Sequence, residues 1–302
     1  MKIIVITGAT SFIGLHLLQT WLQEDCLICA VVRKGSKKID LLPKNDKLQC
    51  LELNMDEYDK LPQLISQADY FYHLAWEGTR APLRDNAEMQ QHNYECSLKA
   101  FRVAVKLGCQ YFVGSGSQAE YGKMDGIVTE NSACNPSTEY GIYKLKTCEM
   151  LGNLAQKEQI HFIWTRIFSL YGPHDDPRTL ISSCIKKMLN NEESPMTQCS
   201  QLWDFLYVGD AALAMKHLVL QKCESGVYNL ASGKILPLKD FVIKLKDILG
   251  SSSELRFGAI PYGPSGPVDL KPDVRKILQT GWSAQTDFKE GILKTVKGSV
   301  EL

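Results

Sequence analysis

Hydrophobic residues follow two alternating patterns along the first half of the chain. Short runs rich in valine, isoleucine and leucine predict buried strands, and longer stretches with apolar residues every three or four positions predict helices. The expected strands cover residues 2–7, 27–32, 70–74, 111–114 and 161–167, and the expected helices cover residues 14–23, 85–107 and 138–157. This alternation is typical of parallel strands joined by crossover helices.

The expected helix over residues 85–107 presents one continuous face. Its members follow one another at steps of three and four: Met89, Asn93, Cys96, Ala100, Val103 and Leu107. Such a face packs either into the core of the protein or against a second copy of the chain. The pattern leaves both interpretations open.

Prolines and glycines become frequent after residue 170. This composition predicts short elements and loops instead of a further regular series of strands and helices. We therefore expect a smaller, loop-rich lobe in the C-terminal part of the chain.

Composition narrows the class of protein. Lysine plus arginine and aspartate plus glutamate both number 34, so the chain has no overall positive charge with which to bind nucleic acid. No apolar stretch reaches the about 20 residues that span a bilayer, so we expect no membrane association. The 10 cysteines are scattered, which favours reduced thiols in the cytoplasm. Cys26 and Cys29 have C-x-x-C spacing, but no second such pair completes a metal site, and we expect no metal.

A strand, a turn of small residues and an amphipathic helix follow one another at the start of the chain. Glycine permits the sharp reversal of the backbone, and a helix N-terminus attracts a pyrophosphate. The spacing is G-x-x-S-x-x-G instead of the usual G-x-G-x-x-G, so an ordinary strand-to-helix turn stays an alternative. We expect six residues to contact a dinucleotide, namely Gly8, Thr10, Ser11, Phe12, Ile13 and Gly14.

These features predict an α/β fold, a Rossmann-type doubly wound parallel sheet with a smaller, loop-rich C-terminal substrate lobe. The expected dinucleotide-binding domain covers residues 1–168 together with about 205–232. The expected substrate-binding lobe covers residues 169–204 and 233–302.

Two cations follow the second expected strand, at the place where NAD-binding sites have an acidic residue for the ribose 2′-hydroxyl. They are Arg33 and Lys34. A guanidinium in this position pairs with a 2′-phosphate through two charge-assisted hydrogen bonds. The alternative is a solvated basic loop. We expect NADP(H) to be favoured over NAD(H), which also favours reduction as the direction of the reaction.

Tyr140 and Lys144 are four positions apart in a helical pattern, so their side chains project from one face. A nearby ammonium favours the phenolate and lowers the pKa of a tyrosine toward values that suit proton transfer. Such a pair also occurs by chance in many helices. The pair therefore indicates catalysis only together with the motifs that surround it in the sequence.

Several motifs occur in a fixed order around this pair. They are Thr7 to Gly14, His73-Leu74-Ala75, Asn93, Phe112 to Gly122, Tyr140 with Lys144, Arg166 with Tyr171-Gly172-Pro173, and Asp204 to Asp210. In this order the chain resembles, over nearly its whole length, the extended short-chain dehydrogenase/reductase family and its NAD-dependent epimerase/dehydratase group. Members of that family act mainly on nucleotide-activated sugars, so the resemblance implies a nucleotide-sugar substrate.

The resemblance also implies a role for each matched residue. Ser117 corresponds to the hydroxyl residue that hydrogen-bonds the reacting oxygen. Tyr140 corresponds to the proton donor or acceptor, and Lys144 to the residue that orients the nicotinamide ribose. Further cofactor contacts are implied for Asn54, Leu74 and Ala75.

Three positions depart from the family pattern. Family dehydratases have an Asp-Glu pair after the catalytic hydroxyl residue, whereas this chain has Gln118-Ala119, so we expect no dehydration. Ser169 replaces a common asparagine, and Trp203 replaces an arginine that helps to hold the substrate diphosphate. Candidates to replace that arginine are Arg178, Arg256 and Arg275. The expected substrate contacts are Trp76, Ser117, Gln118, Ser169, Arg178, Trp203 and Arg256.

The sequence favours an NAD(P)-dependent oxidoreductase of deoxysugar biosynthesis that reduces the 4-keto group of a nucleotide-linked 4-keto-6-deoxy sugar with NADPH. A nucleotide-sugar 4-epimerase with retained NAD(P) uses the same residues and stays an alternative. A non-catalytic dinucleotide-binding sensor is a third reading, although such a protein is expected to have lost part of the Ser117, Tyr140 and Lys144 set. The resemblance further implies a homodimer formed through the helices near 85–107 and 138–157.

Overall fold

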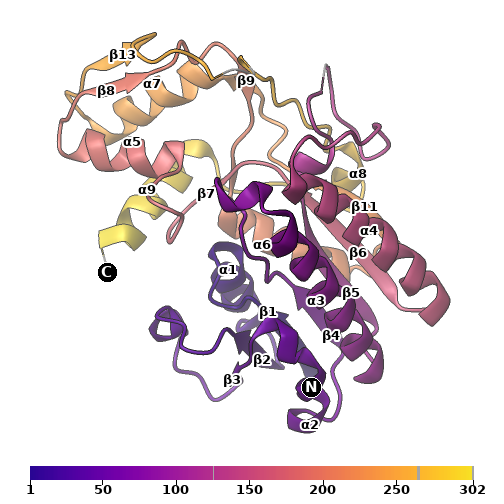
Figure 1. Cartoon of the computed structure of the whole chain (residues 1–302). Coiled ribbons are helices and arrows are strands. Elements are labelled where there is room, and N and C mark those ends of the chain that lie inside the picture. The colour runs from indigo at the N-terminus through magenta and orange to yellow at the C-terminus, as the bar shows by residue number, and fades with distance from the viewer. Residues whose placement is uncertain (125, 264–265, 301–302) are drawn as a thin grey trace. The chain divides into compact units, whose positions relative to one another are not determined.

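The central element of the structure, a computed structural model that describes residues 1–124, 126–263 and 266–300, is a seven-stranded sheet. Its strand order is β11-β6-β5-β4-β1-β2-β3 (Figure 1). The five neighbouring pairs from β6 to β3 are all parallel. The strands are β1 (Lys2–Thr7), β2 (Cys26–Val32), β3 (Leu48–Glu52), β4 (Tyr70–His73), β5 (Tyr111–Ser117), β6 (His161–Ile167) and β11 (Gly226–Leu230).

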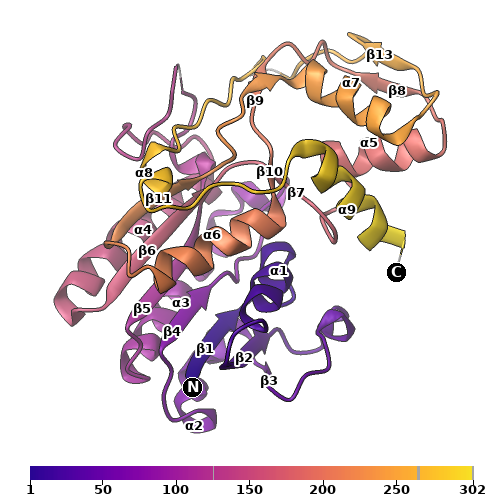
Figure 2. The ribbon, with the colours of Figure 1, turned by 180° about the vertical axis from the view of Figure 1, so that it is seen from behind.

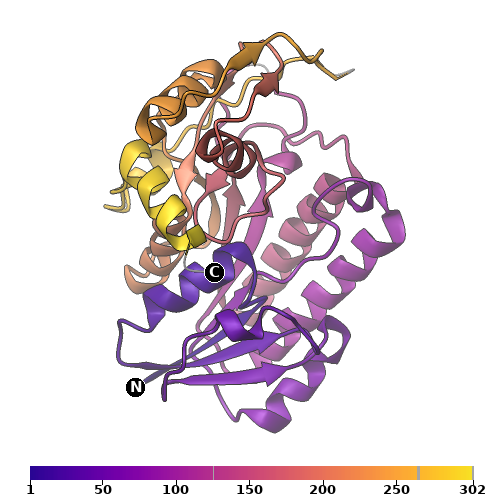
Figure 3. The same ribbon diagram turned by 90° about the vertical axis from the view of Figure 1, so that its left-hand side faces the viewer.

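Helices cover both faces of this sheet, which confirms the doubly wound α/β fold. α3 (Ala87–Lys106) and α4 (Glu139–Glu158) lie on the face seen in Figure 1. α1 (Phe12–Trp21) and α6 (Val208–Leu220) lie on the opposite face, seen in Figure 2. Trp21 and Met215, which belong to α1 and α6, both contact Tyr72 of β4. Figure 3 shows the sheet from the side, with a layer of helices on either face.

The five strands and three helices expected in the first half are present, with small differences at their ends. β5 extends three residues beyond the expected end at residue 114, because Ser115, Gly116 and Ser117 continue to pair with β6. α1 begins at Phe12 instead of residue 14, because Ser11 caps it. β3 and β11 were not expected, since both are short strands at the edges of the sheet.

The apolar face expected on the helix 85–107 belongs to the protein core. Ala100, Val103 and Leu107 are buried in one cluster with Phe71 and Phe112 of the sheet. Each buried residue of this size removes apolar surface from water, which stabilises the fold. The interpretation of this face as a contact with a second copy is therefore wrong, and a dimer needs a different face of α3.

The chain divides into two compact units, each of which is described by itself. The first comprises residues 1–122, 130–167 and 212–229, and the second comprises residues 123–129, 168–211 and 230–302. The expected division into a dinucleotide-binding domain and a substrate-binding lobe concerns function and stays a prediction. The expected lobe includes residues 264–265 and 301–302, which lie outside the described residues.

The second unit is built from short elements, as its prolines and glycines predict. Its helices are α5 (Leu180–Leu189), α7 (Leu238–Leu249), α8 (Arg275–Leu278) and α9 (Phe288–Val300). Its strands pair two by two: β7 (Leu170–Tyr171) with β10 (Leu206–Tyr207), β9 (Leu202–Trp203) with β12 (Leu236–Pro237), and β8 (Ser194–Met196) with β13 (Leu255–Phe257). Aromatic rings of Tyr171, Phe205, Phe241 and Phe288 pack at centroid distances of 5.1–6.4 Å. These ring contacts hold together elements too short to form a sheet of their own.

Within the described part of the chain, no helix combines the length and apolar character needed to cross a membrane. The same residues contain no group of three or more His, Cys, Asp or Glu side chains placed to bind a metal ion.

Candidate active site

The turn between β1 and α1 is shaped by two glycines and a capping serine. Gly8 has a φ of +67°, and a Cβ there would lie 2.8 Å from the backbone nitrogen of Ala75. A Cβ on Gly14 would lie 2.2 Å from the Gly8 carbonyl oxygen. The Ser11 hydroxyl accepts a hydrogen bond from the Gly14 N–H at 3.1 Å, so this side chain is used as the helix cap.

The N-terminus of α1 fits a dinucleotide diphosphate. Its first turn contains no acidic residue. Among the described residues, no partner is found for the N–H groups of Phe12 and Ile13, and a helix N-terminus with free N–H groups attracts an anion. Leu74 and Ala75 follow β4, which is the direct neighbour of β1 in the sheet. The structure thus brings together the predicted cofactor contacts Gly8, Thr10, Ser11, Phe12, Ile13, Gly14, Leu74 and Ala75.

The cofactor contacts predicted after β2 and β3 are Arg33, Lys34 and Asn54. Arg33 is exposed, and its Nη1 lies 3.4 Å from Glu77 Oε1. Lys34 Nζ lies 2.6 Å from Glu57 Oε1, and the Asn54 N–H donates to the other oxygen of the same carboxylate. Hydrogen bonds from Lys34 and from a second lysine lower the pKa of Glu57 to about 2. This region therefore offers a guanidinium that suits a phosphate and carboxylates that suit ribose hydroxyls.

The three predicted catalytic residues lie in the first unit, at the end of β5 and in the first two turns of α4. Ser117 is the last residue of β5, and Tyr140 and Lys144 are the second and sixth residues of α4. Tyr140 is 9% exposed and Lys144 is 2% exposed. Lys144 Nζ donates to the Ser115 carbonyl at 2.6 Å. The pair therefore lies on the buried side of the helix, as its spacing predicts.

Two side chains that the sequence did not assign to catalysis surround this pair. Lys144 Nζ lies 3.7 Å from the centroid of the Trp76 ring. The Arg84 guanidinium carbon lies 4.8 Å from the centroid of the Tyr140 ring, and the Tyr140 and Trp76 rings meet edge to face at 6.1 Å. Trp76 had been expected only as a substrate contact, and Arg84 had no role at all. Arg84 follows no local motif that would have singled it out, and the motif before Trp76 gave no indication of its contact with Lys144.

Burial sets the charge on both catalytic side chains. It lowers the pKa of Lys144 to about 7, and the negative charge of Glu120 works in the opposite direction. Burial raises the pKa of Tyr140, although the hydrogen bond with Ser117 and the positive charge of Arg84 oppose this. At neutral pH, Tyr140 is therefore a protonated phenol that can donate a proton.

The loop after β4 is fastened to α3 by amide side chains. Gln90 Oε1 accepts a hydrogen bond from Trp76 Nε1 at 2.8 Å, and Gln90 Nε2 donates to the Gly78 carbonyl at 2.9 Å. Asn93 Oδ1 accepts the Glu77 N–H at 2.9 Å. Buried amides bonded in this way give the loop a single conformation. The sequence feature that could have identified these two amides is their spacing of three positions, which places both on the buried side of α3.

Two predicted substrate contacts carry buried polar atoms without a partner among the described residues. They are Oε1 of Gln118, in the first unit, and Nε1 of Trp203, in the second. An unsatisfied buried polar atom costs about 1–3 kcal/mol, so each such atom in a native fold needs an explanation. A hydrogen bond with a bound molecule is one that suits residues of a binding site.

The second unit contains a mostly apolar cavity of about 370 Å³. Trp203, Phe205 and Leu238 line it together with Ser169, so the structure brings two predicted substrate contacts to one cavity. The remaining lining residues are Leu170, Asp175, Thr179, Leu180 and Ile181.

The arginines considered for the substrate diphosphate do not line this cavity. Arg178 is exposed and bonds Asp176 through two nitrogens, at 2.9 and 2.6 Å. Arg256 is half exposed and lies 2.6 Å from Glu193. Arg275 is exposed and pairs with a neighbouring carboxylate, Asp273. In each case the guanidinium is already engaged by a carboxylate of this chain.

The chain is similar over most of its length to known proteins of one family. Residues 4–231 match the NAD dependent epimerase/dehydratase family. The chain is 25% identical over 300 residues to a CDP-abequose synthase of Salmonella muenchen, covering 97% of this chain and 96% of that protein. It is 25% identical over 244 residues to a dTDP-6-deoxy-L-talose 4-dehydrogenase (NAD(+)) of Aggregatibacter actinomycetemcomitans, covering 79% and 87%. It is 26% identical over 308 residues to a putative UDP-glucose 4-epimerase of Methanocaldococcus jannaschii, covering 97% of each.

Solved structures share the fold over nearly the whole chain. A UDP-N-acetylglucosamine 4-epimerase from Methanobrevibacter ruminantium, in complex with UDP-N-acetylmuramic acid, has a TM-score of 0.90 at 22% identity, covering 99% of this chain and 98% of that chain. MoeE5 in complex with UDP-glucuronic acid and NAD has a TM-score of 0.84 at 23% identity, with the same coverage. At these identities the likeness establishes the fold.

Proposed function

We propose that this chain, which belongs to the NAD dependent epimerase/dehydratase family, reduces the 4-keto group of a nucleotide-linked 4-keto-6-deoxy sugar and uses NADPH as its hydride source. The family membership makes it a nucleotide-sugar enzyme of the NAD(P)-dependent oxidoreductase type. The choice of reaction and of cofactor is the proposal.

The chain's own residues supply the proton chemistry of this reaction. A reduced nicotinamide cofactor, held by the turn before α1 and by Lys144, would supply the hydride for carbon 4 of the sugar. Tyr140, a protonated phenol at neutral pH, gives its proton to the oxygen of the former ketone. Ser117 hydrogen-bonds the same oxygen and stabilises the negative charge that develops there. Lys144 holds the nicotinamide ribose, and its ammonium favours proton release from Tyr140.

The observation that carries the proposal is the chemistry next to Ser117. Tyr140 is the acid of this cluster, and the residue after Ser117 is Gln118, whose amide can bind a substrate but cannot act as an acid or base. Glu120, the carboxylate in the same turn, is fully buried and bonded to Arg166. The cluster therefore suits addition of a hydride and a proton at one carbon and lacks the carboxylates for elimination.

Two relatives support this reaction by their names. One is a CDP-abequose synthase, and the other is a dehydrogenase that acts at position 4 of dTDP-6-deoxy-L-talose with NAD(+). Redox chemistry at carbon 4 of a nucleotide-linked deoxy sugar is common to the second name and to our proposal. Arg33 after β2 supports NADPH in place of NADH.

We further propose that the cavity of the second unit binds the nucleotide. Its volume of about 370 Å³ lies within the range of small-molecule sites. Trp203 and Phe205 offer ring faces for a base, and Ser169 and Asp175 offer hydrogen-bonding groups. Trp203 Nε1, buried without a partner among the described residues, can donate to a substrate oxygen.

A nucleotide-sugar 4-epimerase is the second candidate. The observation that favours it is the pairing of Arg33 with Glu77, because a carboxylate beside the ribose suits NAD, the usual retained cofactor of family epimerases. The putative UDP-glucose 4-epimerase among the relatives supports the same reading. Tyr140 would then pass the proton in both directions, with the same residues.

The test is a direct assay of both reactions. The purified protein is mixed with NADPH or NADH and with CDP-, dTDP-, GDP- or UDP-linked 4-keto-6-deoxy sugars, and the loss of reduced nicotinamide is followed. We expect NADPH oxidation with at least one of these sugars, in one-to-one ratio with the product. Interconversion of UDP-hexoses without net cofactor turnover would instead establish the epimerase and overturn the reductase.

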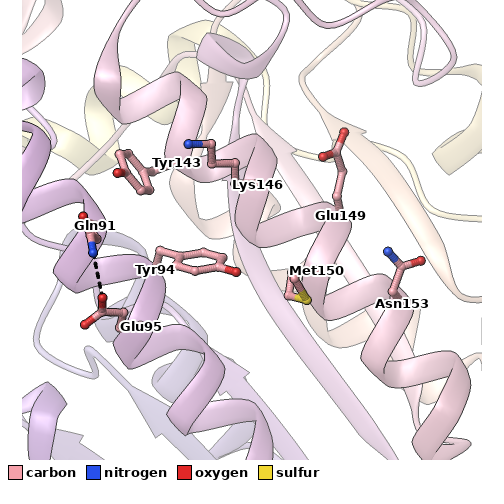
Figure 4. A pocket seen from close by; sticks show the side chains of 8 residues that line it. All are labelled: Gln91, Tyr94, Glu95, Tyr143, Lys146, Glu149, Met150 and Asn153. Carbon is pink, nitrogen blue, oxygen red and sulfur yellow. Dashed lines mark hydrogen bonds between the residues drawn. The ribbon is translucent and has the colours of Figure 1, made fainter.

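We also propose that two copies of the chain associate through α3 and α4. A groove of about 530 Å³ runs between these helices on the side away from the core. Its rings and thioether, Tyr94, Tyr143 and Met150, face outward between Gln91 and Asn153 (Figure 4). A second copy is the occupant that suits a groove flanked by Glu95, Lys146 and Glu149, because a two-fold axis brings the lysine of each copy to a carboxylate of the other.

Oligomeric state tests this part of the proposal. Light scattering of the wild type should give twice the chain mass, and Tyr143→Glu together with Met150→Glu should give the monomer with an unchanged fold by circular dichroism. A wild-type monomer at micromolar concentration would overturn it. A cytoplasmic location is the last part of the proposal and is supported by the 10 cysteines, all within the described residues and none in a disulfide, which suits a reducing compartment.

A further inference from the structure

Glu120 is a carboxylate with no exposed surface, and it lies in the turn η4 (Gln118–Glu120) directly after Ser117. Its Oε1 accepts a hydrogen bond from the Ser117 N–H at 2.7 Å, and its Oε2 accepts one from Arg166 Nε at 2.7 Å. Trp164 Nε1 donates to both oxygens, at 3.0 and 3.2 Å. The proposed reduction mechanism assigns no role to this buried carboxylate.

Stability alone does not account for the ion pair. The Arg166 side chain is 5% exposed and that of Glu120 is 0% exposed. Removing a charge from water costs several kcal/mol per ion, and apolar residues of similar volume often replace a buried pair without loss of stability. The pair is nevertheless kept within the same turn as a proposed catalytic residue.

The end of β5 is shaped to admit this carboxylate. A Cβ on Gly116 would lie 2.6 Å from Glu120 Oε1 and 2.3 Å from Trp164 Nε1, so any larger residue would displace both. Gly116 is also the register partner of Arg166 across β5 and β6. Glycine at this strand position is thus explained by the close approach of the carboxylate and its partners.

The carboxylate fixes Ser117 from the backbone side. Glu120 binds the Ser117 N–H, and the Ser117 hydroxyl oxygen accepts a hydrogen bond from the Ala119 N–H at 3.2 Å. Because a lone pair of the hydroxyl is used in this way, its proton is left to donate to another oxygen. The turn therefore presents Ser117 as a hydrogen-bond donor, which is the role proposed for it.

Glu120 also supplies the negative charge that acts on Lys144. The groups that face Lys144 are Glu120 from η4, His73 from β4 and Tyr140 from its own helix, with Arg84 of η3 (Leu83–Asp85) over the Tyr140 ring. His73 is buried, and burial lowers its pKa to about 3, so it is neutral. Glu120 itself is faced by Arg166, Trp164, Tyr140, Cys134 and Cys148. Burial raises the pKa of Glu120, and the charge of Arg166 favours its ionised form.

We propose that Glu120, held in place by Arg166, is a positioning residue of the reaction: it fixes Ser117 as a donor and maintains the positive charge of Lys144. The inference rests on the proposed function for the roles of Ser117 and Lys144. It adds a buried carboxylate that touches neither substrate nor cofactor and acts through both residues.

The test uses two double variants that remove the whole ion pair, so that no single buried charge is left. Glu120→Gln with Arg166→Met keeps an oxygen for the Ser117 N–H but removes the charge. Reduction should then lose activity at lower pH than in the wild type, with a rate about tenfold lower near pH 8 and nearly unchanged near pH 6. Glu120→Met with Arg166→Met also removes the oxygen, and kcat should fall by about tenfold or more at every pH while KM for the nucleotide sugar stays within about twofold.

A second ion pair in the same unit, in which the lysine is buried and the glutamate side chain is 45% exposed, provides the control. Lys216 Nζ lies 2.5 Å from Glu24 Oε1, and the Lys216 residue is 8% exposed. Glu24→Gln with Lys216→Met also removes both charges of a pair and should leave the pH profile and kcat unchanged, with a smaller fall in melting temperature because water reaches Glu24. If the Glu120 and Arg166 variants are folded and behave like this control, the proposal is wrong.

A measurement without substrate separates this inference from the proposed function. In protein labelled with ¹³C-lysine, the resonance of Lys144, assigned with Lys144→Met, should titrate at lower pH in Glu120→Gln with Arg166→Met than in the wild type. A downward shift supports the action of Glu120 on Lys144 even if the enzyme proves to be an epimerase. An unchanged titration overturns that action even if reduction of a 4-keto sugar is confirmed.

Discussion

The catalytic cluster of the first unit and the cavity of the second unit differ in the polar groups that they contain. In the cluster, Lys144 and Glu120 are buried charges with hydrogen-bond partners within the protein. The cavity is lined mostly by apolar side chains, and the arginines expected near it bind surface carboxylates instead. A preorganised set of charges suits proton transfer, whereas an apolar cavity suits recognition of a flat, mostly uncharged group. Substitutions in the cluster should therefore lower kcat, whereas substitutions in the cavity should raise KM for the nucleotide sugar.

The largest effect should come from Tyr140→Phe. The variant removes the proposed acid but keeps the ring that contacts Trp76, so the fold should be retained. We expect kcat for reduction to fall between about 10²- and 10⁴-fold, with little change in KM for the nucleotide sugar. Steady-state assays of NADPH oxidation measure both. Tyr143→Phe on the same helix is the control, and full activity of Tyr140→Phe would refute the assignment of the cluster.

Trp203→Ala should produce the opposite pattern. Loss of a stacking ring typically costs about 1–3 kcal/mol, so KM for the nucleotide sugar should rise between about 5- and 150-fold. The change in kcat should be small, because the catalytic residues belong to the other unit. Trp203→Phe should recover most of the loss, since it restores a ring face. A fall in kcat at unchanged KM would contradict the assignment of Trp203 to substrate recognition.

The pH dependence should also separate catalysis in the first unit from substrate recognition in the second. Lys144 is protonated below its pKa of about 7 and neutral above it, so the proposed support for Tyr140 is lost as pH rises. We expect kcat for reduction to fall above about pH 7, by up to about tenfold per unit. No lysine or histidine lines the described part of the cavity, so KM for the nucleotide sugar should stay constant between about pH 6 and 8. A rate that instead rises through this range would contradict the assigned role of the ammonium.

The smallest effect should follow Arg33→Gln, because the Arg33 side chain is 71% exposed and its interactions are screened by water. We expect KM for NADPH to rise by about tenfold and KM for NADH to remain unchanged. Lys37→Gln in the same loop is the matched control and should alter neither value. Equal changes for both cofactors would show that Arg33 does not recognise the 2′-phosphate.

Local patterns were sufficient for the elements that carry the catalytic pair. The strands β1, β2, β4 and β5 are mostly buried, so their apolar runs stand out, and the spacing of Tyr140 and Lys144 already placed both on one side of a helix. Glu120 also had a local signal that was not used, because Ser117 and Glu120 form the Ser-x-x-Glu pattern of a capping box. The edge strands β3 and β11 were not predicted, because short and partly exposed strands lack a clear apolar run.

Contacts between distant segments could not be predicted in this way. Arg84 reaches the Tyr140 ring from a loop more than fifty positions away, and Trp76 is held by Gln90 of α3. The arginines considered for the substrate diphosphate illustrate the same limit. Their surroundings decide whether a guanidinium is available, and Arg178 and Arg256 are each bonded to a carboxylate.

The sequence by itself determined the fold class, the glycine turn and the identity of the candidate catalytic residues, because these depend on periodicity and on spacings within one element. Only the tertiary structure decided how those residues are charged and held. The pKa of Lys144 depends on burial and on Glu120, and the orientation of Ser117 depends on a carboxylate fixed by Arg166 from the neighbouring strand. Desolvation and electrostatic interaction arise from groups brought together by packing, and their positions are not contained in any short stretch of the chain.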